Sequence, residues 1–180
     1  MQEQIVYFEE AGEENTSEVL RLVRERANAR GIDKVILAST RGNTARSAME
    51  AFANTNIKLI VIPWQFGFDE TQQFPRELVS ELEAKGHKVH FGTMLFQTEA
   101  FYGSRTPRAM ANLLRMFCQG IKVCVEILLM AADGGLAVMG EKVIAIAGTT
   151  AGADTAVLAT ASPSTKLAGL HISEIICKPL

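Results

Sequence analysis

The chain has 180 residues, of which 48% are hydrophobic and 21% are charged, and its formal net charge is −2 at pH 7. This length suits a single domain, residues 1–180, with a substantial core. The small net charge gives no reason to expect nucleic acid or an anionic membrane as a partner. We also find no apolar run of membrane-spanning length and no export signal in the first ten residues, so we expect a cytoplasmic protein.

The first thirty residues predict a strand followed by a helix. A short strand is expected at Ile5–Phe8, and apolar residues at helical spacing predict a helix over residues 16–29. Asn15, with Glu18 three residues later, fits a capping box at the start of this helix, and Gly31 fits its end.

The stretch Lys34–Arg46, KVILASTRGNTAR, combines a strand, a polar loop and the start of a helix. Its apolar residues Val35–Ala38 fit a buried parallel strand, and a helical pattern begins at Ala45. The loop between them contains Ser39, Thr40, Arg41, Gly42, Asn43 and Thr44. Such a loop places the free N–H groups of a helix N-terminus at the end of a strand, where they bind anions, phosphate above all. The alternative is that Gly42 only supplies a turn and Thr44 only caps the helix.

The middle of the chain continues the alternation of strands and helices. A second buried strand is expected at Leu59–Ile62, and a third, short strand at Lys88–Phe91. Between them we expect a helix at Arg76–Lys85, preceded by Pro75. The loop after the second strand is rich in aromatic planes, and its candidate ligand residues are Trp64, Gln65 and Phe66. Packing or a subunit contact is the alternative role for these aromatic residues.

The last third of the chain contains two helices and three strands. The helices are expected at residues 107–117 and Ile121–Ala132, and the next buried strand at Val143–Ala147. A second small-residue loop follows, with the candidate ligand residues Gly148, Thr149, Thr150, Gly152, Ala153 and Asp154. This loop binds a ligand or is only a tight turn into the next strand. Weak alternation predicts the final strands at Thr155–Ala161 and Leu170–Cys177.

These elements predict an α/β fold, a three-layer sandwich with a mostly parallel sheet and an antiparallel edge formed by the last segments. In such sheets ligands bind beyond the carboxyl ends of the strands, where the strand order reverses. If the strands before them are neighbours, the loops Ser39–Thr44 and Gly148–Asp154 face one crevice. Together with the aromatic loop, this crevice suits the phosphate of a nucleotide or flavin.

The sequence does not reveal catalytic residues. The loop is not a P-loop, because no Gly-Lys-Ser/Thr follows its glycine, and it lacks a GxGxxG fingerprint. No serine or cysteine lies in a nucleophile motif. Asp154 and Glu126 are the acids that could serve as a base in a weaker hypothesis, that of a hydrolase or lyase. For Glu126 the simpler alternative is an exposed helix face or a subunit contact.

The histidines and cysteines do not predict a metal site. His87 and His90 are three apart in a predicted strand, so they face opposite sides of the sheet. Cys118, Cys124 and Cys177 lack metal-ligand spacing, and we expect reduced, mostly buried thiols.

The polar loop carries a family resemblance. Residues Ser39–Arg46 resemble the motif Thr-x-Ser-Gly-x-Ser/Thr-Ala, often followed by Arg, of the C-terminal α/β domain of pyruvate kinase. The chain keeps both hydroxyls, the glycine, the alanine and the arginine, but Arg41 stands where that family has serine. The resemblance extends through Leu59–Ile62 and Val143–Gly152. It implies a pyruvate kinase C-terminal domain-like fold without kinase activity, because the catalytic barrel needs about 250 residues by itself.

The length, the leading segment FEEAGEENT and the loop GTTAGADTA look more like a small, mostly archaeal group of stand-alone proteins of this fold. Members of that group are similar to binders of flavin mononucleotide (FMN), so the resemblance implies FMN as cofactor and leaves open a flavin-dependent oxidoreductase. The alternative is a non-enzymatic sensor or regulatory module for a sugar phosphate or nucleotide. The apolar helix Ile121–Ala132 and the aromatic loop also lead us to expect a homo-oligomer.

Overall fold

The computed structural model describes residues 2–180. Its strands form a mixed sheet in the order β1-β7-β6-β5-β2-β3-β4. They are β1 (Val6–Phe8), β2 (Lys34–Ala38), β3 (Lys58–Ile62), β4 (Lys88–Val89), β5 (Lys142–Ala147), β6 (Thr155–Thr160) and β7 (His171–Pro179). β6 runs antiparallel to both of its neighbours, whereas the other pairs are parallel. The predicted α/β class, with a mostly parallel sheet and antiparallel pairing of the last segments, is confirmed.

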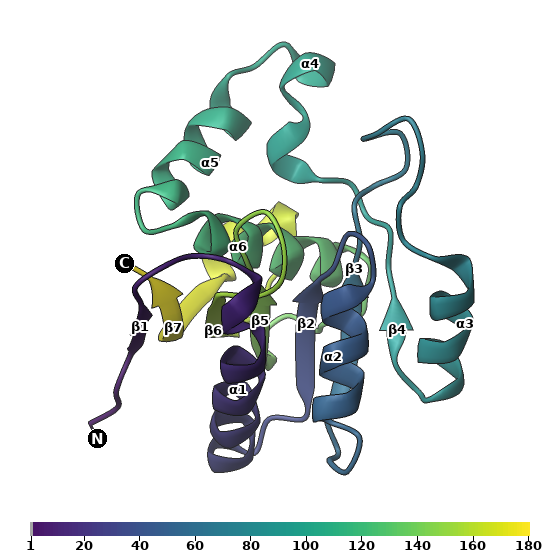
Figure 1. Ribbon diagram of the computed structural model, residues 1–180. Helices are drawn as coiled ribbons and strands as arrows, with labels where there is room; N and C mark the ends of the chain where they lie inside the picture. The colour runs from purple at the N-terminus through teal and green to yellow at the C-terminus, as the bar shows by residue number, and fades with distance from the viewer. Residues whose placement is uncertain (1) are drawn as a thin grey trace.

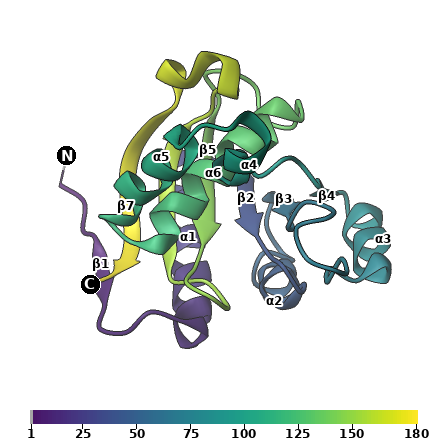
Figure 2. The same ribbon diagram turned by 90° about the horizontal axis from the view of Figure 1, so that it is seen from above.

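Helices cover both faces of this sheet (Figures 1 and 2). They are α1 (Thr16–Arg30), α2 (Asn43–Ala51), α3 (Arg76–Ala84), α4 (Glu99–Tyr102), α5 (Thr106–Arg115) and α6 (Gln119–Asp133), with 3-10 turns η1 (Glu13–Asn15), η2 (Leu95–Gln97) and η3 (Ser164–Gly169). α1, α2 and α3 pack on one face, and α6 crosses the other, with α5 outside it. The three-layer arrangement is therefore present as predicted.

Both faces of β2 are buried, which explains why its sequence is apolar at successive positions. Val35 and Leu37 belong to the core under α1 and α2, and Ile36 belongs to the core under α6. All three side chains are fully buried. Burying each side chain of this size contributes about 1.5–3 kcal/mol, so both layers are held to the sheet through this strand.

Two features of the N-terminal region differ from the sequence-based expectation. The capping box at Asn15 does not form, because the Asn15 amide donates to the carbonyl oxygens of Glu10 and Gly12, at 2.8 and 3.3 Å. The 3-10 turn η1 leads into α1 instead. In addition, β1 pairs with β7, so the first and last strands of the chain lie side by side at one edge of the sheet (Figure 1).

The three cysteines are free thiols, and two of the three are buried, as predicted. Cys124 and Cys177 are fully buried, and Cys118 is partly exposed at the start of α6. Burial raises the pKa of the Cys177 thiol to about 12 and raises the pKa of Cys124 as well. Both therefore stay protonated, and unreactive, at neutral and mildly alkaline pH. No helix in residues 2–180 combines the length and the hydropathy needed to cross a membrane.

We predict that Cys118 reacts first with a thiol reagent such as Ellman's reagent at mildly alkaline pH, and that Cys124 and Cys177 react only after unfolding. The reagent attacks the thiolate, which the two buried thiols do not form below their raised pKa values. The measurement counts modified thiols with time in native protein and in guanidinium. The matched control is Cys118→Ser, and rapid reaction of that native variant would contradict the prediction.

Candidate functional site

The two polar loops lie next to each other at the carboxyl ends of two neighbouring central strands, β2 and β5. β2 has β3 on one side and β5 on the other, and all three strands run in the same direction. Leu37 of β2 is in register with Ile146 of β5, so the loops that follow these strands leave the sheet at the same level. The strand order reverses at this point, which is where open α/β sheets bind ligands.

The loop between β2 and α2 contains a row of backbone N–H groups that have no acceptor within residues 2–180. The Ser39 N–H donates to the Ile62 carbonyl at 3.2 Å, and the Ala45 N–H donates to the Ser39 hydroxyl at 3.3 Å. For the N–H groups of residues 40–44, between these two, residues 2–180 provide no hydrogen-bond acceptor. Orphan N–H groups at the start of a helix attract an anion through their own polarity and through the helix dipole.

Gly42 is required by the geometry of this loop. It precedes the first residue of α2 with a positive φ of 88°, a conformation that glycine adopts without strain. A Cβ at this position would lie 2.5 Å from Cδ2 of Leu78 and 3.3 Å from Cδ of Pro75. The start of α2 is therefore pressed against α3, and the turn that exposes the donors depends on the missing side chain.

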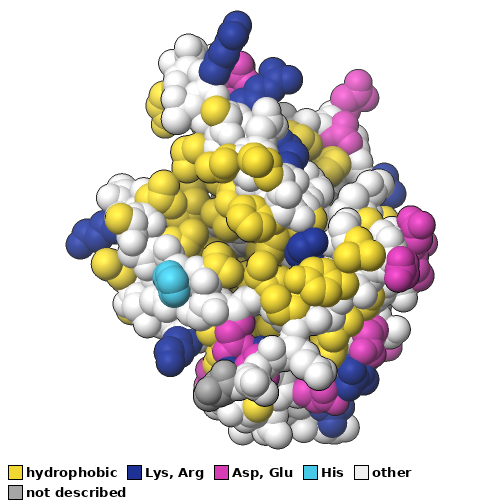
Figure 3. All heavy atoms as spheres, turned by 90° about the vertical axis from the view of Figure 1, so that its left-hand side faces the viewer, with side chains coloured by type: hydrophobic (Ala, Val, Ile, Leu, Met, Phe, Trp, Pro, Cys, Tyr) yellow, Lys and Arg dark blue, Asp and Glu magenta, His cyan; other side chains and the backbone are white. Residues whose placement is uncertain are grey.

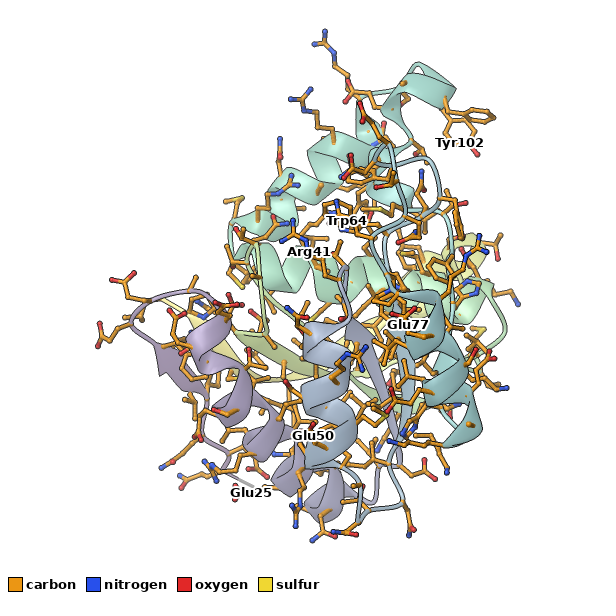
Figure 4. The ribbon with its side chains drawn as sticks, turned by 45° about the vertical axis from the view of Figure 1, so that its right-hand side comes forward. Glu25, Arg41, Glu50, Trp64, Glu77 and Tyr102 are labelled. Carbon is orange, nitrogen blue, oxygen red and sulfur yellow. The ribbon has the colours of Figure 1, made fainter. Side chains whose placement is uncertain are left out.

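Two arginines flank the loop and differ in their partners. Arg41 is exposed and donates from Nε to Oε1 of Gln73 at 2.8 Å, so it bridges to the segment after β3. Figure 4 shows Arg41 above the N-terminal end of α2, on the same side of the molecule as Trp64. Arg46 points along the surface to Glu81, at 3.3 Å. Only Arg41 is therefore placed beside the free N–H groups.

The aromatic loop after β3 is held to the segment that follows β4. Gln65 accepts a hydrogen bond from the N–H of Met94 at 2.7 Å. Trp64 packs partly against the core under α6, and the Phe66 ring lies 4.9 Å from that of Phe91. Gln65 and Trp64 thus anchor the loop, whereas Phe66 is 64% exposed and has a face available for contact.

The loop from Gly148 to Asp154 is a closed turn around the Asp154 carboxylate, which is fully buried. Its Oδ2 accepts hydrogen bonds from the N–H groups of Gly12 and Thr149, at 3.2 and 2.9 Å. Its Oδ1 accepts from the Thr155 hydroxyl at 2.7 Å. This carboxylate connects distant parts of the fold. Because it is buried and already hydrogen-bonded, it does not face a ligand in the crevice.

The N-terminal segment covers the far side of the same loop. The N–H of Ala153 donates to the Thr16 hydroxyl at 3.0 Å, and a Cβ on Gly152 would lie 2.3 Å from the Cα of Glu13. Thr150 is exposed, with a positive φ of 67°, and Thr149 is partly exposed. These two threonines carry the hydroxyl groups of the loop that reach the surface.

Glu126 is buried, contrary to the simpler expectation of an exposed face or a subunit contact. It and Lys122 are each 2% exposed and form an ion pair one helical turn apart on α6. Glu126 also accepts a hydrogen bond from the N–H of Phe96 at 2.9 Å, and the Lys122 ammonium lies 5.3 Å from the Phe96 ring. The pair holds η2 on α6 and leaves Glu126 without access to a substrate.

No group of three His, Cys, Asp or Glu residues within residues 2–180 is arranged to hold a metal ion. His87 accepts a hydrogen bond from the N–H of Leu59 through Nδ1, at 3.2 Å. Burial lowers the pKa of His87, with smaller contributions from Lys58 and Lys85. A neutral imidazole is what this acceptor role requires.

Two surface hollows lie away from the N–H groups of residues 40–44. One of about 1170 Å³ lies between α1 and α2, lined among others by Arg24, Asn28 and Glu50. Figure 4 shows Glu25 and Glu50 near the lower ends of these helices, opposite Arg41. A second, of about 360 Å³, lies between η2 and α5. Neither hollow is lined by a residue of the two polar loops.

No protein-family model matches the chain. Among solved structures, the chain is similar to a pyruvate kinase from Cryptosporidium parvum, with 15% identity and a TM-score of 0.45 over 82% of this chain and 23% of that one. It is also similar to Cryptosporidium parvum pyruvate kinase in complex with ADP, with 16% identity and a TM-score of 0.41 over 79% of this chain and 22% of that one. The chain spans less than a quarter of the length of these pyruvate kinases.

We predict that Gly42→Ala lowers the free energy of unfolding by about 2–4 kcal/mol, because a positive φ and a contact with Leu78 both oppose a side chain. Gly67 is the matched control, with a φ of 79° and no atom within 4 Å of the position that a Cβ would take. Gly67→Ala should cost only about 1 kcal/mol. Urea unfolding measures both, and equal losses would contradict the close-packed start of α2.

We further predict that Asp154→Ala destabilises the protein by about 3 kcal/mol, because two partly buried N–H groups and one buried hydroxyl lose a charged acceptor. The same change at the exposed Asp33 should alter the free energy of unfolding by less than about 0.5 kcal/mol. Urea unfolding again provides the measurement. A loss at Asp154 no larger than that at Asp33 would show that this carboxylate does not join the loop to the N-terminal segment.

Proposed function

We propose that the protein binds a phosphorylated small molecule through the N–H groups of residues 40–44 at the start of α2. The observation that carries this proposal is the row of donors without acceptors, located where the strand order of the sheet reverses. Arg41 beside the row supplies a positive charge, and it would exchange Gln73 for a phosphate oxygen. Thr149 and Thr150 add hydroxyls from the neighbouring loop.

FMN is the ligand that we propose for this site. The free donors match its phosphate, and the exposed ring of Phe66, beside Phe91, is a surface on which a flat ring system can stack. The resemblance carried by the segment FEEAGEENT and the loop GTTAGADTA, to a group of proteins similar to FMN binders, supports the same ligand. When bound, the flavin would supply electron-transfer chemistry. We assign no reaction, because Asp154 and Glu126 are both engaged inside the fold.

The second candidate is a non-enzymatic sensor or regulatory module for a sugar phosphate or a nucleotide. Two observations favour it. The acids considered as a base make internal contacts, and the donor row recognises phosphate whatever group carries it. This candidate predicts thermal stabilisation by such a ligand without turnover.

We predict that Asn43→Asp weakens FMN binding by at least about tenfold, because it adds a negative charge beside the phosphate donors. Asn43 is exposed at the first position of α2, where the helix dipole favours a carboxylate, so the fold should be preserved. Asn56→Asp makes the same chemical change at an exposed position outside the loop and should bind FMN as the wild type does. Flavin fluorescence titration measures the affinities.

Wild-type protein should purify yellow or take up FMN, and it should bind riboflavin, which lacks the phosphate, more weakly than FMN. Equal FMN affinity in Asn43→Asp and wild type would refute the phosphate site. A colourless protein that takes up no flavin, but that a sugar phosphate or nucleotide stabilises in wild type and not in Asn43→Asp, would favour the sensor over the flavoprotein.

A further inference from the structure

One side of the sheet is left uncovered at its β1 edge. Val6 and Phe8 pack toward the core under α1, so Tyr7 points to the opposite face, where it is 51% exposed. On that face α6 packs against β2, β3, β5 and β6. Leu170, just before β7, and Ile172 and Ile175 within it pack against the clusters beneath α5 and α6. The face of β1 and of the end of β7 therefore lies open beside α5.

The end of α5 presents apolar side chains next to this open face. Leu113, Met116 and Phe117 are 62%, 80% and 57% exposed, and they lie three and four residues apart, on one side of the chain as it leaves the helix. Leu114 instead packs inward against the core beneath α5. The inner side of α5 therefore already has its partner, whereas the outer side has none within residues 2–180.

The open face of β1 and the apolar end of α5 form one continuous surface. Cys118, directly after Phe117, lies 3.6 Å from the Thr155 hydroxyl at the start of β6. β6 leads across the sheet to the end of β7, where Lys178 pairs in register with Tyr7. Figure 3 shows hydrophobic side chains gathered around a hollow on this side of the molecule. We name it the lateral apolar face, made of Ile5, Tyr7, Leu113, Met116, Phe117 and Leu180.

The size of the face approaches that of a protein–protein interface. Its side chains are 41% to 80% exposed and together present on the order of 600 Å² of apolar surface. This is at the upper limit of the largest patch on a typical monomer, roughly 300–600 Å², and it approaches the roughly 800 Å² that each partner buries in a stable complex. The surrounding polar residues would supply the remainder.

We propose that the lateral apolar face is the interface of a homodimer with two-fold symmetry. Such an interface must be complementary to itself, and this face carries both a protruding part, the end of α5, and an adjacent hollow that can receive it (Figure 3). Charged residues of both signs adjoin the face in sequence: Arg115 precedes Met116, Glu9 follows β1, and Lys178 lies over the Tyr7 ring, so opposite charges can meet across the axis. A membrane surface fits less well, since the chain has a net charge of −2.

Sedimentation equilibrium tests the proposal. Wild-type protein should have about twice the chain mass of 19.6 kDa. Phe117→Glu and Tyr7→Glu, from the two halves of the face, should each raise the dimer dissociation constant by roughly thirtyfold or more, because each buries a charge in the apolar interface. Both side chains are exposed, so the variants should fold. Circular dichroism checks this.

The matched control is Phe101→Glu, at an 83% exposed position on α4, which should remain dimeric. A wild type that stays monomeric up to roughly 100 μM would overturn the proposal, since a weak interface would already associate there. A dimer that tolerates both Phe117→Glu and Tyr7→Glu would overturn it too. So would cosedimentation of a monomeric wild type, but not of these variants, with phosphatidylcholine and phosphatidylglycerol vesicles, which would assign the face to a membrane.

Discussion

The buried carboxylate of Asp154 is the constraint on which the rest of the structure depends. It accepts hydrogen bonds from the N-terminal segment at Gly12, from its own loop at Thr149 and from Thr155 at the start of β6. Thr155 in turn touches Cys118 and leaves room only for a glycine at position 120, so the start of α6 is seated on the same point. A buried charge is tolerated only when it is satisfied in this way, and its donors come from distant parts of the chain.

This arrangement gives the two polar loops different hydrogen-bonding states. The loop after β5 is folded back on Asp154 and covered by the N-terminal segment, so its donors are largely used within the protein. The loop after β2 leaves the sheet at the same level, but within residues 2–180 its N–H groups at positions 40–44 have no acceptor, because Gly42 turns the chain against Leu78. The two loops resemble each other in composition, yet one stabilises the fold and the other is open to an anion.

Sequence reasoning succeeded where the signal was local. The apolar run of β2, the polar turn after it and the apolar α6 are each specified by neighbouring residues, and each lies where the sequence predicted. The sequence did not predict the pairing of β1 with β7, because the two strands come from opposite ends of the chain. The sequence also did not predict that Glu126 is buried. Its partner Lys122 is only one helical turn away, but its burial depends on η2 and Phe96.

The sequence by itself determined the α/β class, the mostly parallel sheet and the turn of Lys34–Arg46, because apolar runs, helical spacing and a glycine at a strand end act over a few residues. Only the tertiary structure decided that the Asp154 carboxylate finds its donors inside the fold, while residues 2–180 supply no acceptor for the N–H groups of residues 40–44. The physical reason is that a polar group's role depends on whether the fold supplies its partner, and those partners are distant in sequence. The sequence thus predicted both polar loops, and the tertiary structure left the donors of the loop at the start of α2 free.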